Sequence, residues 1–457
     1  MTGKTILIAA VACVGVVGAI QGFFSIGCTT DGSGGSGSAP DGEGDGGNTN
    51  TQEEPPLSLQ ERLARCEETK PNACPGGNDD ALKRHEGLVA GAICQFQLID
   101  QNFWDDESAT IDALGKHVEL VDVATLLGDL DHKGVKMEDS HKELDRLELM
   151  YQAFGWDSHD HGDSSWMPQG VSGSADANDD ETIGGRKVVA IAWYHKPENS
   201  DRPGVDKGSR ISFVDVTELP AGKVPYTHAL FVDPFMDNGV PNFRPVRIHV
   251  GGIAWIGRYV YAADTMNGLR VFDTQRILKI TDTTDEAGRD PGTGNYRAYG
   301  HRYAIPQVGA YFQPDSACWH RFSFVAADKT TTPPSLVTGE FHDGDIAGKV
   351  IRWDLDGDRL AFTNAAAKVT QPSEVYLAQE SDMQGAVSFN GHWYLSSSGQ
   401  DGAWGLLYRT APGEKSQSYG WVIGPEDLMF SRKDKVLWSA SEFAGRRYVF
   451  SVDVDKY

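Results

Sequence analysis

Positive charge is scarce in this 457-residue sequence, which has 41 lysine and arginine residues against 65 aspartate and glutamate residues. The formal net charge at neutral pH is therefore -24. An acidic surface repels phosphate groups, so this composition argues against binding of nucleic acid and against binding of anionic lipids through basic patches. The same charge keeps a protein soluble, and it identifies no partner by itself.

Several catalytic and metal-binding motifs are also missing. The chain has no C-x-x-C pair and no H-E-x-x-H spacing, and no G-x-S-x-G, P-loop or dinucleotide fingerprint stands in a strand–helix setting. These absences remove the motif support for thioredoxin-type, zinc-peptidase, esterase and nucleotide-binding functions. They leave open whether the protein is an enzyme, and they indicate no certain cofactor.

Residues 1–28 have the character of an export signal. Lys4 is the one charge before a mostly apolar run over residues 5–24, and Cys28 follows in Ser-Ile-Gly-Cys. Small residues before a cysteine resemble the lipobox of bacterial lipoproteins, although Ser25 stands where that pattern prefers leucine. An uncleaved membrane anchor and simple secretion are the alternatives, because the run is long enough to span a bilayer. We therefore expect an exported protein attached to a membrane or released outside the cytoplasm.

The next segment, residues 29–56, contains no large apolar residue and is rich in glycine, serine and acidic residues. Such a segment buries too little surface to offset its ordering entropy, which predicts a disordered acidic tether. A small α-helical region is expected over residues 57–160. Helical spacing of apolar residues favours helices at 79–100 and 138–156, with Tyr151 and Phe154 on one face of the second.

Short strand patterns fill residues 161–457 and repeat five times. The expected first strands of the five copies are 166–173, 248–256, 305–313, 382–390 and 423–431. One four-stranded sheet is unstable alone, but copies arranged around an axis cover one another, so the pattern predicts an all-β fold, a five-bladed β-propeller. A six-bladed ring is the alternative, with the inserted segment 318–328 contributing to an extra blade. A segment just before residue 166 is expected to close the ring.

Glycine and tryptophan recur at fixed places in these copies. Glycines in the expected first strands suit crowding near the axis, and the tryptophans suit the space between blades. These residues are Gly170, Gly252, Gly309 and Gly385, and Trp193, Trp353, Trp393 and Trp438.

Residues 164–457 also contain the strings WMPQGVSG, PNFRPVRIHVGGIAWIGRYVYAADT, RYAIPQVGAYF and GWVIGPEDL. In these strings the chain is similar to a group of exported bacterial proteins to which no activity is assigned. The resemblance implies a propeller-like fold and an extracytoplasmic location, and it implies no reaction.

Four cysteines remain once Cys13 and Cys28 are assigned to the signal. An even number in an exported protein suggests two disulfides, and four cysteines allow three pairings. We favour a local Cys66–Cys74 loop and a Cys94–Cys318 link between domains.

Polar residues at two equivalent positions of the copies are the candidate site. Those expected on first strands are Gln169, His249, Gln307, Gln384, Glu426 and Asp427, and those ending second strands are Tyr194, Asp264, Glu340, Ser398 and Glu442. The first set either holds a ligand in the channel or bonds neighbouring backbone. The acids suggest a glycan hydrolase using Glu340 and Glu442, a Ca²⁺ site, or turn structure. His342 follows Glu340 and joins this candidate centre.

Two short motifs contain further metal-ligand residue types. Asp354, Asp356 and Asp358 alternate as in calcium loops, but an Asp-Gly turn between strands explains them without an ion. The string HDHGD at residues 159–163 fits a solvated loop better than a metal site.

The leading functional hypothesis is a membrane-tethered extracytoplasmic propeller that binds a ligand, an envelope protein or a glycan. An envelope hydrolase acting on a polar substrate is the second hypothesis, and a purely structural envelope protein is the third.

Overall fold

The computed structural model describes residue 74, residues 82–138 and residues 142–457. The chain divides into two units, Met1–Pro56 and Leu57–Tyr457, and all described residues belong to the second. The expected signal, the tether, Cys28 and Cys66 lie outside the described residues. No helix in the described part is long and apolar enough to cross a membrane.

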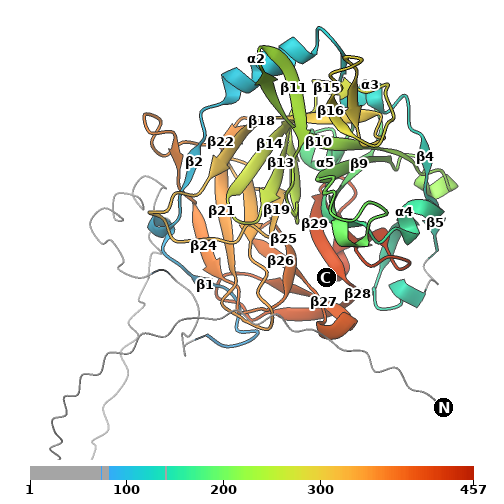
Figure 1. Ribbon diagram of the computed structural model, residues 1–457. Coiled ribbons are helices and arrows are strands. Elements are labelled where there is room, and N and C mark those ends of the chain that lie inside the picture. The colour runs from blue at the N-terminus through green and yellow to red at the C-terminus, as the bar shows by residue number, and fades with distance from the viewer. Residues whose placement is uncertain (1–73, 75–81, 139–141) are drawn as a thin grey trace, which may run out of the picture. The chain divides into compact units, whose positions relative to one another are not determined.

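Strands that pair mainly antiparallel form the framework of the described chain (Figure 1), and they fall into five groups that follow one another along the sequence. The first group contains β7 (Trp166–Gly173), β8 (Val188–His195), β9 (Ser209–Asp215) and β10 (Pro225–Asp237). The second contains β12 (Ile253–Ile256), β13 (Tyr259–Asp264), β14 (Gly268–Asp273) and β18 (Tyr303–Phe312). The third contains β19 (Phe324–Asp328), β20 (Ser335–Gly339), β21 (Lys349–Asp356), β24 (Glu374–Leu377) and β1 (Val89–Ala90). Valine, isoleucine and aromatic residues are frequent in these strands, as expected from their β propensity.

The remaining two groups complete the order. The fourth contains β25 (Met383–Phe389), β26 (His392–Ser397), β27 (Trp404–Thr410) and β28 (Gln417–Ile423). The fifth contains β29 (Pro425–Ser431), β30 (Val436–Ser441), β31 (Tyr448–Asp453), β6 (Met150–Gly155) and β5 (Val135–Met137). Four short strands extend these sheets: β11 (Val240–Pro245), β15 (Ile277–Lys279), β22 (Arg359–Leu360) and β23 (Val369–Thr370). Strands β16 (Ala287–Arg289) and β17 (Tyr296–Ala298) form a separate two-stranded sheet.

The first strands of the groups lie against one another in a closed order. Strand β7 contacts β12, β12 contacts β19, β19 contacts β25, β25 contacts β29, and β29 returns to β7. Hydrophobic clusters fill the space between each group and the next, and the four expected tryptophans are all buried in them. This is the arrangement of a β-propeller, as the repeats predict. Parallel pairing of β10 with β18 joins the first two groups into one sheet, so the sheets alone do not give a blade count.

The third repeat differs from its sequence alignment. Residues 305–313 fall largely in β18, the outer strand of the second group, and the first strand of the third group is β19. The segment expected to be an insertion therefore supplies an inner strand. Two glycines show the difference: a Cβ on Gly252 would lie 2.2 Å from the backbone N of Val325, whereas one on Gly309 would lie 2.3 Å from the ring of Trp104. Gly252 is crowded by an inner strand, and Gly309 by a helix on the outside.

Strand β6 closes the ring, as predicted for a segment before residue 166. It pairs antiparallel with the last strand, β31, with Phe154 opposite Val449. The same residues were expected to be a helix. They form a strand because the edge of β31 supplies backbone partners, and the expected helix at 79–100 is likewise absent over its described residues, 82–100.

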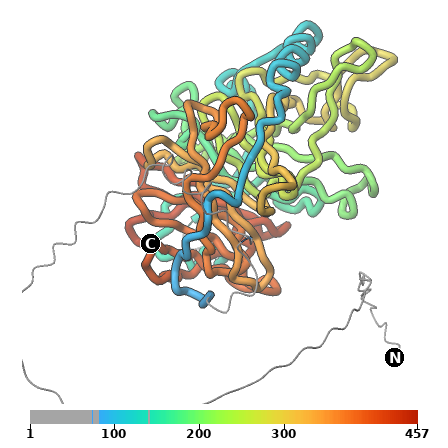
Figure 2. The backbone as a smooth tube through the Cα atoms, turned by 90° about the vertical axis from the view of Figure 1, so that its left-hand side faces the viewer, coloured from blue at the N-terminus to red at the C-terminus, as the bar shows by residue number. Residues whose placement is uncertain are grey.

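An N-terminal belt over residues 82–133 runs along the outer strands (blue in Figure 2). Its strands are β1, β2 (Leu98–Asp100), β3 (Glu119–Val121) and β4 (His132–Lys133), which pair with β24, β18, β15 and β10. The α-helices of the described chain are short: α2 (Trp104–Leu114), α3 (Val123–Leu126), α4 (Ser158–Gly162) and α5 (Ser174–Ala177). The region before the propeller thus adds short helices and edge strands to it.

One disulfide joins a residue before the belt to the propeller region, and it is neither of the two favoured links. Cys74 is bonded to Cys318, with a Cα–Cα distance of 5.5 Å. Because Cys74 and Cys318 are bonded to each other, the expected Cys94–Cys318 and Cys66–Cys74 links are both wrong. Cys94 is also in a disulfide. The chain beside Cys94 does pass Cys318, whose N–H donates to the Gln95 carbonyl, but the fold brings Cys74, 244 positions away in the sequence, into bonding distance of Cys318. The pairing is thus set by which cysteines the fold brings together and not by their closeness in the sequence.

Candidate functional site

A cavity of about 650 Å³, named here the axial cavity, lies where the inner strands begin and the second strands end. Its lining includes most of the polar residues that the repeats single out: Gln169, Tyr194, His249, Asp264, Gln384, Glu426 and Glu442. Gln307, Glu340, Ser398 and Asp427 do not line it. Antiparallel pairing puts the start of one strand beside the end of the next, which gathers the two sets at one end of the ring.

Gln169 links two sides of the axial cavity. Its Nε2 donates to Glu442 Oε2 at 3.3 Å and to the Pro168 carbonyl at 3.0 Å. Its Oε1 lies 2.9 Å from His249 Nε2, and an amide oxygen only accepts, so the histidine carries its proton on Nε2. Burial lowers the pKa of His249 to about 4, with Lys196 and Arg321 acting in the same direction. The imidazole is therefore neutral at pH 7, and it stacks on Tyr194 with 4.1 Å between ring centroids.

Two carboxyl groups face the same cavity. Burial raises the pKa of Glu442, against the opposing charges of Lys196 and Arg447. Burial also raises the pKa of Glu426 well above its ordinary value, and the neighbouring Glu442 and Asp427 raise it further. Both shifts favour the protonated form, so the pair is placed to offer a proton donor beside a hydrogen-bond acceptor.

Asp427 has a separate, structural position. Its Oδ2 accepts hydrogen bonds from the backbone N–H groups of Val171 and Ile253, at 3.1 and 3.2 Å. These donors belong to β7 and β12, so one carboxyl group of β29 ties three inner strands together. Gln384 donates to Ser398 Oγ at 3.3 Å, which fixes the amide on the cavity wall.

Glu340 does not belong to the axial cavity, which corrects the expected Glu340–Glu442 pair. Its side chain is fully buried and its Oε2 is 2.7 Å from Lys349 Nζ. His342 Nε2 lies 3.2 Å from Oε2, and the Arg321 N–H donates to Oε1 at 2.9 Å. Burial raises the pKa of Glu340, but His320, His342 and Lys349 outweigh it and hold the pKa well below the ordinary range. With both oxygens occupied, this carboxylate is part of the core, and the half-buried His342 lies beside it.

Gln307 and Asp264 are joined through one arginine. Gln307 lies in β18, outside the inner strands, and its Oε1 accepts from Arg270 Nη1 at 3.0 Å. Arg270 Nε donates to Asp264 Oδ2 at 2.7 Å. The expected place of Gln307 on an inner strand is therefore wrong, whereas Asp264 reaches the cavity as an ion-paired residue.

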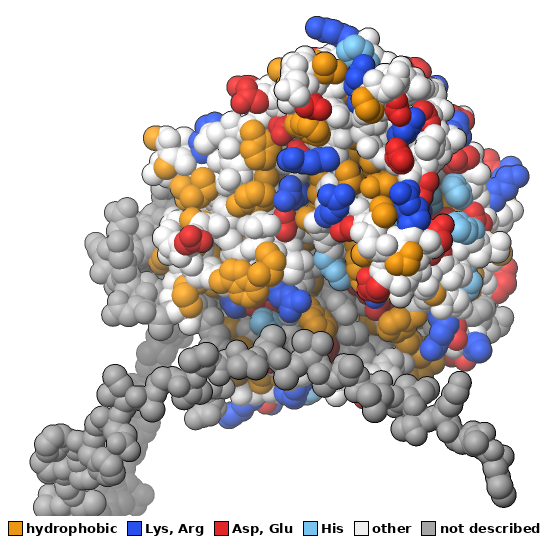
Figure 3. Space-filling model, viewed as in Figure 1, with side chains coloured by type: hydrophobic (Ala, Val, Ile, Leu, Met, Phe, Trp, Pro, Cys, Tyr) orange, Lys and Arg blue, Asp and Glu red, His pale blue; other side chains and the backbone are white. Residues whose placement is uncertain are grey.

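A second cavity, also about 650 Å³ and named here the lateral cavity, lies beside α4, β4, β9 and β10. Histidines gather on the side of the molecule where Figure 1 labels α4 and β4 (Figure 3). Asp157 caps α4 by accepting from the N–H groups of His159 and Asp160, and this cap directs Asp160 inward. The motif HDHGD thus places one buried carboxylate at a cavity wall, which the expected solvated loop did not anticipate.

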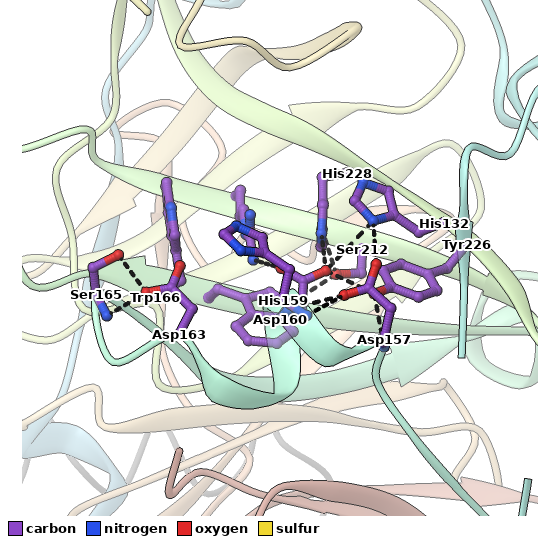
Figure 4. A network of polar contacts seen from close by, with 12 residues as sticks. His132, Asp157, His159, Asp160, Asp163, Ser165, Trp166, Ser212, Tyr226 and His228 are labelled. Carbon is purple, nitrogen blue, oxygen red and sulfur yellow. Dashed lines mark hydrogen bonds and ion pairs between the residues drawn. The ribbon is translucent and has the colours of Figure 1, made fainter. Parts of the chain in front are cut away.

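Asp160 is the centre of a polar network (Figure 4). Its Oδ1 accepts from Arg210 Nη2 at 2.8 Å, and its Oδ2 accepts from Tyr226 Oη at 2.7 Å and His228 Nε2 at 2.9 Å. Burial opposes ionisation, but His228 and Arg210 outweigh it and lower the pKa of Asp160 well below its ordinary value. Burial lowers the pKa of His228 to about 4, so this imidazole is neutral at pH 7.

The network also contains the one cluster of metal-ligand type found among the described residues. His132, Asp160 and His228 each offer one ligand atom, and the three atoms lie within 4.8 Å of one another. Two nitrogens and one oxygen do not match the all-oxygen set that Ca²⁺ prefers. The acids of the expected calcium loop instead form the β21–β22 hairpin, where Asp356 pairs with Arg359 across the turn.

Comparison with known proteins identifies no family for this chain. No protein-family model matches the sequence, and no curated protein matches it. Among solved structures, Sqt1 from Chaetomium thermophilum is 10% identical, with coverage of 61% of this chain and 58% of that chain and a TM-score of 0.27. This chain thus spans less than two thirds of the length of Sqt1.

Two further structures are similar at the same level. The PQQ-bound aldose sugar dehydrogenase from Streptomyces coelicolor is 14% identical, with coverage of 71% and 99% and a TM-score of 0.32. The Swd1 β-propeller domain from Myceliophteria thermophila is 10% identical, with coverage of 64% and 96% and a TM-score of 0.30. These values are too low to transfer a ligand or an activity to this chain.

Proposed function

We propose that this propeller module binds a small hydroxyl-rich ligand of the saccharide class in the axial cavity. The observation that carries the proposal is the bridge by Gln169 between the neutral imidazole of His249 and the carboxyl group of Glu442. Each member has hydrogen-bonding capacity left after these contacts, and all line one cavity. Convergent donors and acceptors in a preformed cavity are the general signature of a small-ligand site.

The chemistry of the lining supports a saccharide. Carboxyl, amide and imidazole groups hydrogen-bond vicinal hydroxyls, and the ring of Phe341 adds an apolar surface for the carbon skeleton. Acidic and basic side chains both line the cavity, which fits an uncharged ligand better than a strongly charged one. A cavity of about 650 Å³ has the volume typical of small-molecule sites.

We further propose that the module acts outside the cytoplasm, tethered through its N-terminal segment. The apolar run at residues 5–24 followed by Cys28 supports this location. The Cys74–Cys318 disulfide supports it too, since disulfides persist in oxidising compartments. Replacement Cys28→Ser should move the protein from the membrane fraction to the soluble extracytoplasmic fraction. An unchanged membrane fraction would exclude the lipid anchor.

A saccharide hydrolase is the second candidate, and one observation favours it: Glu426 and Glu442 line the same cavity and Glu442 raises the pKa of Glu426. Glycosidases use two carboxyl groups in different protonation states. Glu340, bound in the core by Lys349, is not available for this role.

The binding proposal is tested by thermal unfolding with a panel of mono- and disaccharides, because a ligand that binds the native state raises Tm. At least one sugar should raise the Tm of the wild type, and Glu442→Gln and Gln169→Ala should lose the shift. Glu198→Gln is the matched control, since it removes a nearby negative charge from an exposed residue outside the lining. Absence of any shift, or equal shifts in all four proteins, would exclude a saccharide in this cavity.

The same sugars decide between binding and hydrolysis. Product release by the wild type that Glu426→Gln and Glu442→Gln both abolish would identify a hydrolase. A Tm shift without any product would leave a binding module.

A further inference from the structure

We propose that the lateral cavity contains a binding site for zinc or a similar first-row divalent cation, with His132, Asp160 and His228 as ligands. The three residues come from β4, α4 and β10, so the site forms only when the belt packs on the first group of strands. The proposal concerns a different cavity from the proposed saccharide site, and each can fail without the other.

The spacing of the ligand atoms supports this site. Zinc binds nitrogen and oxygen at about 2.0–2.1 Å in tetrahedral geometry, which puts neighbouring ligand atoms about 3.3 Å apart. Asp160 Oδ2 lies 2.9 Å from His228 Nε2 and 3.7 Å from His132 Nδ1. These two distances lie on either side of the ideal, and all three ligand atoms lie within 4.8 Å of one another, so side-chain shifts of at most about 1.5 Å bring them to a common cation.

The hydrogens in the network explain how a cation fits. The Nε2 of His228 and the Nδ1 of His132 now direct their N–H groups at carboxylate oxygens. A cation at the same position replaces these protons, which pass to the other ring nitrogens or to water. His228 Nδ1 is 2.9 Å from Ser212 Oγ, an oxygen that can accept a hydrogen bond from the N–H once the proton is on Nδ1.

Supporting contacts hold the ligands from behind. Arg210 donates to the other oxygen of Asp160, and its guanidinium lies between the indoles of Trp166 and Trp193, at 4.5 and 4.8 Å from their centroids. The indole N–H of Trp193 donates to Ser212 Oγ at 2.7 Å, which fixes the hydroxyl beside His228. Metal ligands are characteristically oriented by such outer contacts.

The open side of the site defines its type. Two of the ligands are buried, but the His132 side chain is 28% exposed and lines the lateral cavity, so a cation has a path to enter. Three protein ligands leave a fourth position toward the cavity for water or another small ligand, as in catalytic rather than structural zinc sites. Asp131 Oδ1, 3.9 Å from His132 Nε2, adds negative charge at this side.

The test uses untagged full-length protein, freed of metal by a chelator with its disulfides intact. Isothermal titration with ZnCl₂ should give one site per chain, and Co²⁺ should give the intense visible absorption of a four-coordinate complex. His132→Ala should weaken zinc binding at least about 100-fold and abolish the cobalt spectrum, since a ligand is lost. This variant removes the most exposed ligand, and His228→Ala gives a second measurement if it folds.

His161→Ala is the matched control, because it changes a histidine of α4 that is not in the cluster. It should bind zinc as the wild type does, and so should Glu442→Gln in the axial cavity. Circular dichroism of the metal-free proteins checks that His132→Ala is folded. No stoichiometric zinc binding by the wild type, or equal binding by His132→Ala, would overturn the proposal.

Discussion

Glu340 and Lys349 form an ion pair inside the third group of strands, with 2.7 Å between Oε2 and Nζ and side chains that are 0% and 8% exposed. The sequence presents Glu340 as a catalytic carboxylate, because its position in the repeat matches that of Glu442. The two equivalent positions have different surroundings: a lysine and two histidines surround one, and a cavity adjoins the other. Equivalence in a repeat therefore does not predict equivalent chemistry.

Replacement Glu340→Gln should destabilise the fold by about 3–5 kcal/mol, because it leaves the Lys349 ammonium buried without its counter-charge. Urea unfolding of the wild type and the variant measures this difference. The double variant Glu340→Gln with Lys349→Met removes the buried charge and should recover part of the loss. Equal stability of the wild type and Glu340→Gln would mean that the ion pair contributes nothing.

The strand assignment of β6 gives a second prediction. Phe154 is fully buried and Tyr151 is 49% exposed, although a helix would put them on one face. Phe154→Ala should cost about 3–5 kcal/mol, and Tyr151→Ala should change stability by no more than about 0.5 kcal/mol. Denaturant unfolding of the two variants provides the comparison. Similar losses in both would contradict the closure of the ring by this strand.

The propeller could be predicted from the sequence because its signal is periodic. Every copy repeats an apolar first strand, a turn and a second strand, and the glycine at position 252 of the second copy reports real crowding by β19. The third copy was aligned wrongly, because the strand that contains Gly309 has the sequence pattern of an inner strand although it is the outer strand β18. Its glycine is required by Trp104, a contact that no local pattern encodes.

The helix expected at residues 138–156 failed for a related reason. Apolar residues at spacings of three and four are compatible with a helix, but the last residues of that pattern, Met150–Gly155, are equally compatible with a strand. The unpaired edge of β31 decides the outcome, and it lies about 300 residues away in the chain. Propensity is a weak predictor wherever a sheet edge offers backbone partners.

The candidate sites also differ in whether a repeated pattern or a long-range contact places their residues. The axial residues occupy repeated positions, so their convergence could be predicted, although not the ion pairing of Glu340. The lateral cluster is not periodic: Asp160 stands in the HDHGD motif, but His132 and His228 come from distant segments. The sequence contains one indication of this cluster, an aspartate between two histidines in HDHGD. The positions of His132 and His228 depend on the pairing of the belt strand β4 with β10, which no local pattern predicts.

Loss of the Cys74–Cys318 disulfide should destabilise the protein by about 2–4 kcal/mol, because the link joins residues separated by 244 positions and restricts the unfolded chain. Thermal and urea unfolding of Cys318→Ser measure the loss. The double variant with Cys74→Ser should match the single one, since either change removes the same bond. Unchanged stability in both would show that this link contributes nothing to the stability of the fold.

Asp176 of α5 gives a prediction about pH. Its side chain is buried and accepts a hydrogen bond from Ser172 Oγ at 2.6 Å. Burial raises the pKa of Asp176 from 3.8 to about 7, against the hydrogen bond from Ser172. Between these two pH values the folded protein retains a proton that the unfolded chain has released. Stability from this group is therefore fully present below about pH 4 and is lost as pH rises through 7.

The variant Asp176→Asn should remove this loss, because an amide does not titrate. Between pH 4 and pH 8 the wild type should lose on the order of 4 kcal/mol more than the variant, at about 1.4 kcal/mol per pKa unit. Urea unfolding at one-unit pH intervals measures both curves, with Asp356→Asn on the exposed β21–β22 hairpin as the control. Other buried acids such as Glu426 contribute equally to all three proteins, so the difference isolates Asp176. Parallel curves for the wild type and Asp176→Asn would mean that this carboxyl group is ionised at neutral pH in the folded protein.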